Sequence, residues 1–261
     1  MNKEERHQYI VDQLVTHEKI MVADLAQELN VTPETIRRDL GELEMNDQLT
    51  RVHGGAIRYI PTNKELAYER KMSIQYEEKV NIAKKAATYI GHGDTIVVDV
   101  GTTTVHIADM LEDIHSLTVV TNSLSAAQRF NLAIEEKRIS GQVIMLPGFT
   151  HPDQASVKGA YTVEMLRRFH FNRAFISCGG ITEDGMYDFD MDESLISEVM
   201  MQNSQEAILL IDSSKINKDA LFKIGPCSSL TKVISDVERP VDWKQSNYEW
   251  VSTDDTLREE R

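Results

Sequence analysis

The sequence has few cysteines and no long apolar run, and each shortage excludes a class of protein. Only two cysteines, Cys178 and Cys227, occur among its 261 residues, which is no disulfide framework, and neither has the spacing of a metal site. No apolar run approaches the length of a membrane span, and the polar amino-terminus lacks the pattern of a signal peptide. We therefore expect a cytoplasmic protein with no membrane contact.

Basic residues are also scarce, and this limits how the chain can bind nucleic acid. It holds 28 Lys or Arg against 42 Asp or Glu, for a formal net charge of −14, and residues 1–60 alone hold seven basic and eleven acidic residues. An acidic protein has no general attraction for DNA, so any DNA binding must depend on a local basic patch. The candidates for that patch are Arg37, Arg38, Arg51, His53 and Arg58, with Arg6 as a further candidate.

The stretch Val31–Leu40, VTPETIRRDL, predicts the start of an amphipathic helix. Thr32 is a suitable N-cap, and Pro33 suits the first helical position because its missing N–H is not needed there. Ile36 and Leu40 are four residues apart, a spacing that predicts one buried face. The helix is therefore expected to pack against a core along one side.

Two adjacent arginines lie on the opposite face of this predicted helix. At about 100° per residue, Arg37 and Arg38 point away from the apolar stripe. Guanidinium groups held on a rigid helix suit DNA phosphates and base edges. For the arginine pair taken alone, an ordinary surface helix with a Glu34–Arg38 ion pair remains the alternative.

The flanking sequence favours the DNA-binding interpretation. Apolar spacing predicts two preceding helices, over residues 6–14 and 22–29, and residues 30–31 make a short turn, which is helix-turn-helix spacing. Two extended runs, 48–52 and 56–60, flank His53-Gly54-Gly55 and predict a hairpin whose glycines adopt positive φ. The unit is therefore predicted to be a winged helix-turn-helix. The residues assigned to DNA contact are Thr32, Pro33, Thr35, Arg37, Arg38, Arg51, His53 and Gly54.

Beyond the wing, apolar runs and amphipathic stretches alternate. The predicted strands are Thr95–Val100, Leu117–Thr121, Gln142–Leu146, Arg173–Ser177, Ala207–Ile211 and Lys232–Ser235. The predicted helices are Glu77–Ile90, Thr103–Glu112, Ser123–Phe130, Ser156–Phe169 and Asp192–Asn203. Such alternation predicts an α/β domain with a mostly parallel sheet. We expect domain boundaries at residues 1–57, a linker at 58–76, an effector-binding and oligomerisation domain at 77–240, and a C-terminal extension at 241–261 that adds an edge strand.

Polar and glycine-rich residues follow five of the predicted strands. In DVGTTT, Asp99 to Thr104, a glycine turn leads into a helix whose backbone N–H groups and hydroxyls favour an anion such as phosphate. The carboxyl ends of parallel strands share one edge, where ligands bind. Each segment alone is explained equally well by turn and cap chemistry, but the five together favour a small polar ligand. The other four segments are Thr121-Asn122-Ser123, Pro147-Gly148, Cys178-Gly179-Gly180 and Asp212-Ser213-Ser214-Lys215.

These motifs carry a family resemblance. TPETIRRDL followed by LxRVHGGA (Leu49 to Ala56) resembles the amino-terminal domain of DeoR-type bacterial transcriptional regulators, and DxGTTT, TNS, Gly159 and DSSK resemble their effector domain. That domain is similar to the fold of ribose-5-phosphate isomerase. The resemblance implies that a phosphorylated sugar or related metabolite modulates DNA binding. The implied effector site comprises Asp99, Gly101, Thr102, Thr103, Asn122 and Lys215, to which we add Thr104 and Gly148 from the same strand ends.

The chain departs from the family pattern at three places. Asp47 stands where members usually have glycine before the wing, and Pro147-Gly148 where they usually have Gly-Gly. Ser197-Glu198 stands where many members carry Lys-Arg, so two positive charges near the proposed anion site are missing.

Two apparent metal motifs do not satisfy the ligand rules. Asp188, Asp190 and Asp192 imitate the start of a calcium loop, but Glu193 stands where glycine is needed and Val199 where glutamate is needed, so we interpret the run as a solvated acidic loop. The eight histidines show no zinc-type spacing. We expect no cofactor, no metal and no catalytic residue.

The favoured function is a repressor of a carbohydrate-metabolism operon that binds double-stranded operator DNA as a homodimer or higher homo-oligomer. Two alternatives remain open. One is an isomerase-like enzyme with an appended DNA-binding domain, because Asp99 and Lys215 are residue types capable of proton transfer. The other is a regulator whose DNA binding is controlled by a protein partner instead of a small ligand.

Overall fold

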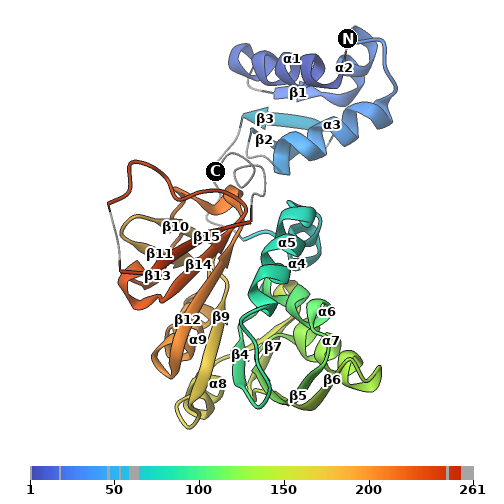
Figure 1. Ribbon diagram of the computed structural model, residues 1–261. Coiled ribbons are helices and arrows are strands. Elements are labelled where there is room, and N and C mark those ends of the chain that lie inside the picture. Colours follow the sequence, from blue (N-terminus) through green and yellow to red (C-terminus); the bar gives the residue numbers. More distant parts are fainter. Residues whose placement is uncertain are drawn as a thin grey trace, which may run out of the picture. The chain divides into compact units, whose positions relative to one another are not determined.

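The structure is a computed structural model that describes residues 2–17, 19–45, 48–52, 54–58, 65–244 and 247–253. The chain divides into two compact units, residues 1–62 and 63–261, which are drawn in Figure 1. Residues 65–76, assigned to a linker from the sequence, fall in the second unit. Among the described residues, no helix has both the length and the apolar character needed to cross a membrane.

The first unit contains the predicted helix-turn-helix and wing (Figure 1). Its helices are α1 (Lys3–Thr16), α2 (Val22–Glu28) and α3 (Pro33–Met45), and buried apolar residues from all three form one core. The wing strands β2 (Leu49–Val52) and β3 (Gly55–Arg58) pair antiparallel. A further strand, β1 (Lys19–Met21), pairs with β3 and was not predicted, because three residues are too few to show alternation.

The two wing glycines serve different purposes. Gly54 has φ +75°, as the tight turn was predicted to require. Gly55 does not have positive φ, so the prediction for it was wrong. A Cβ at Gly55 would lie 1.9 Å from the carbonyl oxygen of Ile20, so glycine is needed there to let β3 approach β1.

The second unit is built on a seven-stranded sheet in the order β15-β14-β12-β9-β4-β5-β6, and every neighbouring pair is parallel. This confirms the predicted parallel α/β architecture, and β15 confirms the expected edge strand. The strand bounds are β4 (Thr95–Val98), β5 (Ile114–Thr121), β6 (Ile139–Met145), β9 (Phe171–Ile176), β12 (Ser204–Ile211), β14 (Lys232–Ser235) and β15 (Glu249–Ser252).

Successive strand residues point to opposite faces of the sheet, and both faces carry apolar side chains. Helices therefore cover both faces. Ile96 and Val98 of β4 pack in one core cluster with α5 (Tyr76–Ala87), α6 (Ile107–Met110) and α7 (Leu124–Glu135). Val97 packs in the other with α8 (Ala160–Leu166) and α9 (Met191–Gln202).

Two predicted helices are wrong in extent. The stretch predicted as helix 103–112 is a 3₁₀ turn, η1 (Thr104–His106), followed by the four-residue helix α6. The stretch predicted as helix 156–169 begins with a strand, β8 (Ser156–Lys158), which pairs antiparallel with β7 (Phe149–His151). Gly159, with φ +110°, separates β8 from α8, a conformation that favours glycine over other residues.

Several short elements were absent from the sequence prediction. A second antiparallel sheet has the order β10-β11-β13, and a short helix, α4, precedes α5. The bounds are α4 (Tyr68–Met72), β10 (Gly180–Thr182), β11 (Gly185–Asp188), β13 (Phe222–Gly225), η2 (Pro152–Gln154), η3 (Ser213–Lys215) and η4 (Cys227–Ser229).

The strand order places a crevice in the centre of the parallel sheet. From β4 the chain builds outward to β5 and β6, then crosses to the other side of β4 and builds outward again through β9 and β12. The connections after β4 and after β9 therefore leave the sheet in opposite directions. Such a topological switch point opens a crevice at the carboxyl ends of the two strands, where ligands of open α/β sheets bind.

Candidate DNA-binding surface and ligand pocket

The arginines of α3 are exposed, as predicted. The Thr32 hydroxyl accepts the Thr35 N–H at 3.2 Å, as an N-cap does. Arg37 and Arg38 are both exposed, and Arg37 Nη1 lies 2.7 Å from Glu34 Oε2. The alternative interpretation expected an ion pair between Glu34 and Arg38, but Glu34 pairs with Arg37, three residues away. Within the described part of the chain, no ion pair engages Arg38.

The inner face of α3 is tied to α1 by a buried ion pair. Asp39 is fully buried, and its two carboxylate oxygens accept hydrogen bonds from Arg6 Nε at 2.5 Å and Arg6 Nη2 at 2.9 Å. Burial by itself would raise the pKa of Asp39, but the bonds and charge of Arg6 outweigh it and hold the pKa below its ordinary value. Arg6 is thus committed to the core, and its inclusion in the basic patch was wrong.

The described wing residues are compatible with DNA contact. Arg51 is exposed, its N–H donates to Glu44 Oε1 at 2.9 Å, and its guanidinium lies beside Gly41 of α3, so wing and helix present basic groups near one another. Gly54 is exposed at the turn. His53 and Asp47 lie outside the described residues, as does the side chain of Arg58. The assignment of the patch to DNA stays a prediction.

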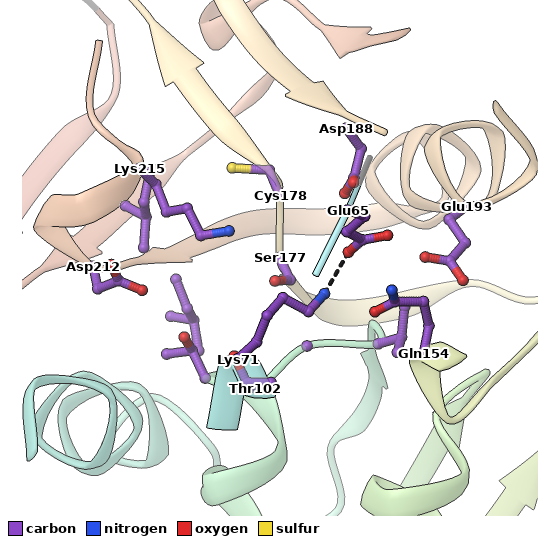
Figure 2. A pocket seen from close by; sticks show the side chains of 15 residues that line it. Glu65, Lys71, Thr102, Gln154, Ser177, Cys178, Asp188, Glu193, Asp212 and Lys215 are labelled. Atoms are coloured by element: carbon purple, nitrogen blue, oxygen red, sulfur yellow. Dashed lines mark hydrogen bonds and ion pairs between the residues drawn. The ribbon is translucent and has the colours of Figure 1, made fainter. Parts of the chain in front are cut away.

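A pocket opens at the carboxyl ends of β4, β9 and β12, at the switch point of the sheet. Its empty volume is about 460 Å³, a figure that includes space open to solvent. Figure 2 shows its polar side chains converging on one space. The lining residues are Glu65, Lys71, Val100, Gly101, Thr102, Thr103, Gln154, Ser177, Cys178, Asp188, Glu193, Leu210, Ile211, Asp212 and Lys215.

The DVGTTT segment forms one wall of the pocket. Gly101, Thr102 and Thr103 line it, whereas Thr104 is buried and its hydroxyl donates to the Asp99 carbonyl at 2.8 Å. A Cβ at Gly101 would lie 2.5 Å from Ser177 Oγ, so glycine permits the β4 loop to approach the β9 loop. Because only a 3₁₀ turn and a four-residue helix follow, the helix dipole expected to favour an anion is short.

Asp99 lies behind this wall rather than in the pocket lining. Its carboxylate accepts the Ser197 hydroxyl at 2.7 Å and the Val100 N–H at 2.8 Å. Burial, together with the nearby charges of Asp188 and Glu193, raises the pKa of Asp99 to about 8, against the opposing hydrogen bond from Ser197. Asp99 is therefore mostly protonated at neutral pH. Ser197, one of the departures from the family pattern, serves to hold it.

Two other predicted effector residues also lie outside the pocket lining. Asn122 is buried, and its Oδ1 accepts the Val100 N–H at 3.1 Å, while its Nδ2 finds no partner among the described residues. Gly148 has no space for a side chain, since a Cβ would lie 2.4 Å from Thr162 Oγ1. Of the eight predicted effector residues, Gly101, Thr102, Thr103 and Lys215 line the pocket.

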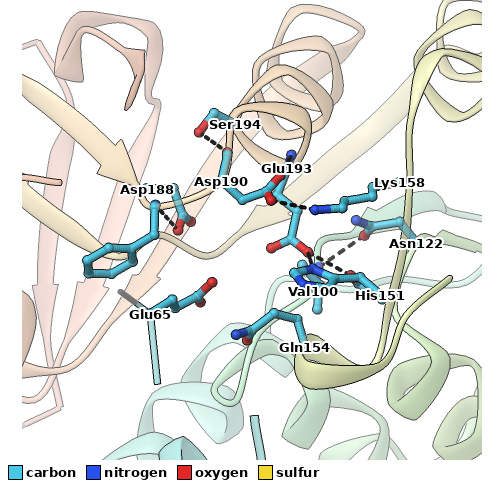
Figure 3. A network of polar contacts seen from close by, with 12 residues as sticks. Glu65, Val100, Asn122, His151, Gln154, Lys158, Asp188, Asp190, Glu193 and Ser194 are labelled. Carbon is cyan, nitrogen blue, oxygen red and sulfur yellow. Dashed lines mark hydrogen bonds and ion pairs between the residues drawn. The ribbon is translucent and has the colours of Figure 1, made fainter. Parts of the chain in front are cut away.

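The charged groups of the pocket are four carboxyls and two ammonium groups. Lys71 forms an ion pair with Glu65, and Figure 2 shows this pair beside the space into which Lys215 points. Within the described residues, neither an ion pair nor a hydrogen bond engages the Lys215 ammonium, although the Lys215 backbone N–H donates to the Asp212 carbonyl at 3.0 Å. The Glu193 carboxylate accepts the Ser156 hydroxyl at 2.6 Å. It also lies 3.2 Å from His151 Nδ1, and Figure 3 shows these two side chains.

The acidic run Asp188, Asp190 and Asp192 is not a solvated loop, and that interpretation was wrong. Asp188 lines the pocket, where burial and then the charge of Glu65 raise its pKa to about 7. Asp190 caps α9 through the Glu193 N–H and pairs with Lys158, as Figure 3 shows. Among the described residues, no group of three or more His, Cys, Asp or Glu side chains is placed to hold a metal ion.

Sequence reasoning missed half of the polar lining. Glu65 and Lys71 belong to a segment without periodicity, and Gln154 to an unpredicted 3₁₀ turn. The one available signal was the strand-end rule, which had already indicated Asp212 at the end of β12 and would also have found Ser177 at the end of β9.

Comparisons with known proteins give a family match for each of the two units. The family model described as the DeoR-like helix-turn-helix domain matches residues 6–61, and that of the DeoR C-terminal sensor domain matches residues 74–237. An uncharacterised HTH-type transcriptional regulator of Staphylococcus epidermidis is 48% identical over 82% of this chain and 84% of its own. The glycerol-3-phosphate regulon repressor of Escherichia coli is 30% identical over 94% of this chain and 95% of its own.

The similarity of the chain to solved structures is weak. A D-ribose-5-phosphate isomerase in complex with phospho-erythronic acid matches with a TM-score of 0.38 and 18% identity, over 54% of each chain. A score this low bears on neither fold nor function.

Proposed function

The chain belongs to the DeoR family of transcriptional regulators, and from that premise we propose that it represses a carbohydrate-metabolism operon and leaves its operator when a phosphorylated metabolite occupies the pocket. The similar proteins are named as transcriptional regulators and repressors, which disfavours the enzyme alternative. The name of the Escherichia coli relative associates it with a phosphorylated three-carbon metabolite, and this supports the class of effector proposed here.

For operator binding, the support is the exposed pair Arg37 and Arg38 on a helix whose inner face is locked. The ion pair of Asp39 with Arg6 holds α3 against α1, so the arginines are presented from a rigid element. A guanidinium that reads guanine in the major groove contributes roughly 1–3 kcal/mol of discrimination. One helix-turn-helix reads a half-site, so we propose that the protein acts as a homodimer or a higher homo-oligomer.

For effector binding, the single observation that carries the proposal is Lys215. Its ammonium lies in the pocket at the switch point of the sheet, with no partner among the described residues. Thr102 and Thr103, which carry hydroxyl groups, line the same pocket. A phosphate between these groups would gain a positive charge and several hydrogen-bond donors.

The carboxyl side of the pocket suits the hydroxyl groups of the same ligand. The carboxylates of Glu193 and Asp212 can accept hydrogen bonds from sugar hydroxyls, and Asp188, with its pKa near 7, can accept or donate one. We propose that a ligand with an anionic end and a hydroxylated end lies across the pocket, its phosphate toward Lys215. The departure at Ser197-Glu198, which lacks two positive charges of the family pattern, then affects how strongly the anionic end binds.

The test uses purified full-length protein and the DNA upstream of its own operon. Gel-shift titration is expected to show a specific complex that a phosphorylated sugar dissociates, while the unphosphorylated sugar does not. A parallel assay for aldose–ketose interconversion is expected to show no turnover. Turnover, or a failure to bind upstream DNA in preference to random DNA of equal length, would contradict the proposal.

A further inference from the structure

Residues 65–72, which precede α5, contribute to the pocket wall and are anchored there. Glu65 forms an ion pair with Lys71, and the two side chains are only 14% and 17% exposed. The Leu66 carbonyl accepts Gln154 Nε2 at 3.0 Å, and the Lys71 carbonyl accepts the buried Lys79 ammonium at 2.6 Å. Glu65 thus stands among the lining residues as a part of the chain's own wall.

This anchoring changes the charge that a ligand meets. Of the two ammonium groups in the pocket, Lys71 is already paired with a carboxylate, whereas Lys215 is not. Glu65 is also close enough to Asp188 to raise that residue's pKa, so it adds negative charge to the pocket wall. An anion that enters the pocket is repelled by Glu65 and finds Lys71 occupied.

We propose that Glu65 is an internal competitor of the effector, and that the phosphate of an effector binds by displacing the Glu65 carboxylate from Lys71. This inference rests on the proposed function, because it assumes that an anionic ligand binds beside Lys215. The exchange moves one carboxylate and breaks no covalent bond. Both lysines then face the phosphate, which supplies the second positive charge that the departure at Ser197-Glu198 removed from the family pattern.

The displaced residue is placed to carry a signal. Glu65 follows β3 of the wing after only residues 59–64, so it begins the anchored part of the second unit. Losing its ion pair leaves the segment up to Met72 held by fewer contacts. A ligand that binds only when Glu65 is released therefore favours a state in which the chain leading to the wing is less restrained, and this differential affinity is what an allosteric ligand needs.

The first experiment measures the affinity of inorganic phosphate for full-length protein by calorimetry. In Glu65→Gln the competitor loses its charge, so phosphate is expected to bind about tenfold more tightly than to wild type, equivalent to about 1.4 kcal/mol. Glu69→Gln is the matched control, since it removes the same charge from an exposed position on α4 and is expected to bind as wild type does.

A double-mutant cycle with Lys71→Gln tests whether the gain acts through Lys71. In the Lys71→Gln background, Glu65→Gln is expected to change phosphate affinity less than threefold. A tenfold gain that persists in this background would overturn the exchange, because it would mean general electrostatic relief. Equal affinities of wild type, Glu65→Gln and Glu69→Gln, together with weaker binding by Lys215→Ala, would overturn this inference alone. No phosphate binding even by Glu65→Gln would overturn the proposed anionic effector as well.

Hydrogen exchange gives a readout of the segment itself. Saturating phosphate is expected to speed exchange in peptides covering residues 66–72 of wild-type protein. The same peptides of Glu65→Gln are expected to exchange fast already and to respond little to phosphate. Slower exchange of this segment in wild type on phosphate addition would contradict displacement, because it would mean that the ligand strengthens the anchor.

Discussion

Replacing Asp39 by Asn is expected to destabilise the first unit, although Asp39 belongs to neither the proposed DNA surface nor the pocket lining. Its fully buried carboxylate accepts two hydrogen bonds from Arg6 and lies 3.2 Å from His7 Nε2. Removing one partner of a buried ion pair typically costs about 3–5 kcal/mol, because the other charge stays buried without compensation. Asn keeps one acceptor oxygen, so we expect the lower end, about 3 kcal/mol.

The assay is native-state hydrogen exchange of α1 and α3 peptides in the full-length protein. A loss of about 3 kcal/mol raises the population of the open state by on the order of a hundredfold, and exchange should quicken accordingly. Glu42→Gln is the control, because Glu42 lies on the same helix and pairs with the exposed Lys3 at 2.5 Å. An ion pair near the surface, with one exposed and one half-buried partner, contributes only about 1 kcal/mol, so exchange of this variant should change little. Equal effects of the two substitutions would refute the reasoning.

The same variant makes a prediction about pH. The pKa of Asp39 is lowered in the folded protein, so its ion pair stabilises the fold at neutral pH and is lost as pH falls through that pKa. The difference in exchange protection between wild type and Asp39→Asn should therefore be constant near pH 7 and shrink below the unfolded-state pKa of about 3.9. A difference that grows on acidification would contradict the assigned direction.

The remaining predictions concern the DNA surface and the wing. Arg38→Ala should weaken operator binding in a gel-shift assay by roughly 1–3 kcal/mol without changing thermal unfolding. Arg37→Ala should weaken binding less, because Arg37 must first break its ion pair with Glu34 to contact DNA. Unaltered operator affinity in both variants would contradict the assignment of these arginines to DNA recognition. Arg51→Ala should lower affinity for specific and random DNA alike and flatten the salt dependence, whereas altered base preference would mean that Arg51 reads bases. Gly55→Ala should disrupt β1–β3 pairing, seen as faster exchange in β1, and unchanged protection there would contradict the close approach.

Local signals were sufficient for much of the fold. Thr32, Pro33 and the spacing of Ile36 and Leu40 specified α3, because capping and one-sided burial are encoded within a few residues. β14 was predicted with its observed bounds, because a strand buried on both faces is a continuous apolar run. β1 was missed since its pairing depends on Gly55, far along the chain.

The pocket was predictable only in part, because residues far apart in the sequence form it. The strand-end rule located Thr102, Thr103 and Lys215, because each follows a strand closely. It did not reveal that β4 and β9 are neighbours, since strand order depends on long-range packing, and so the site could not be centred on that pair. Glu65 and Asp188 reach the pocket from a segment without periodicity and from a small antiparallel sheet, and no local pattern indicates either.

A ligand in this pocket is proposed to release the protein from its operator. The direct measurement titrates the releasing phosphorylated sugar into a pre-formed protein–operator complex of wild type, Thr103→Val and Lys215→Ala. Without effector, both variants should bind operator as wild type does. A charge-assisted hydrogen bond contributes about 1.5–3 kcal/mol, so each variant should need roughly ten- to a hundredfold more effector for release. Release of both variants at the wild-type concentration would contradict the account and place the phosphate elsewhere.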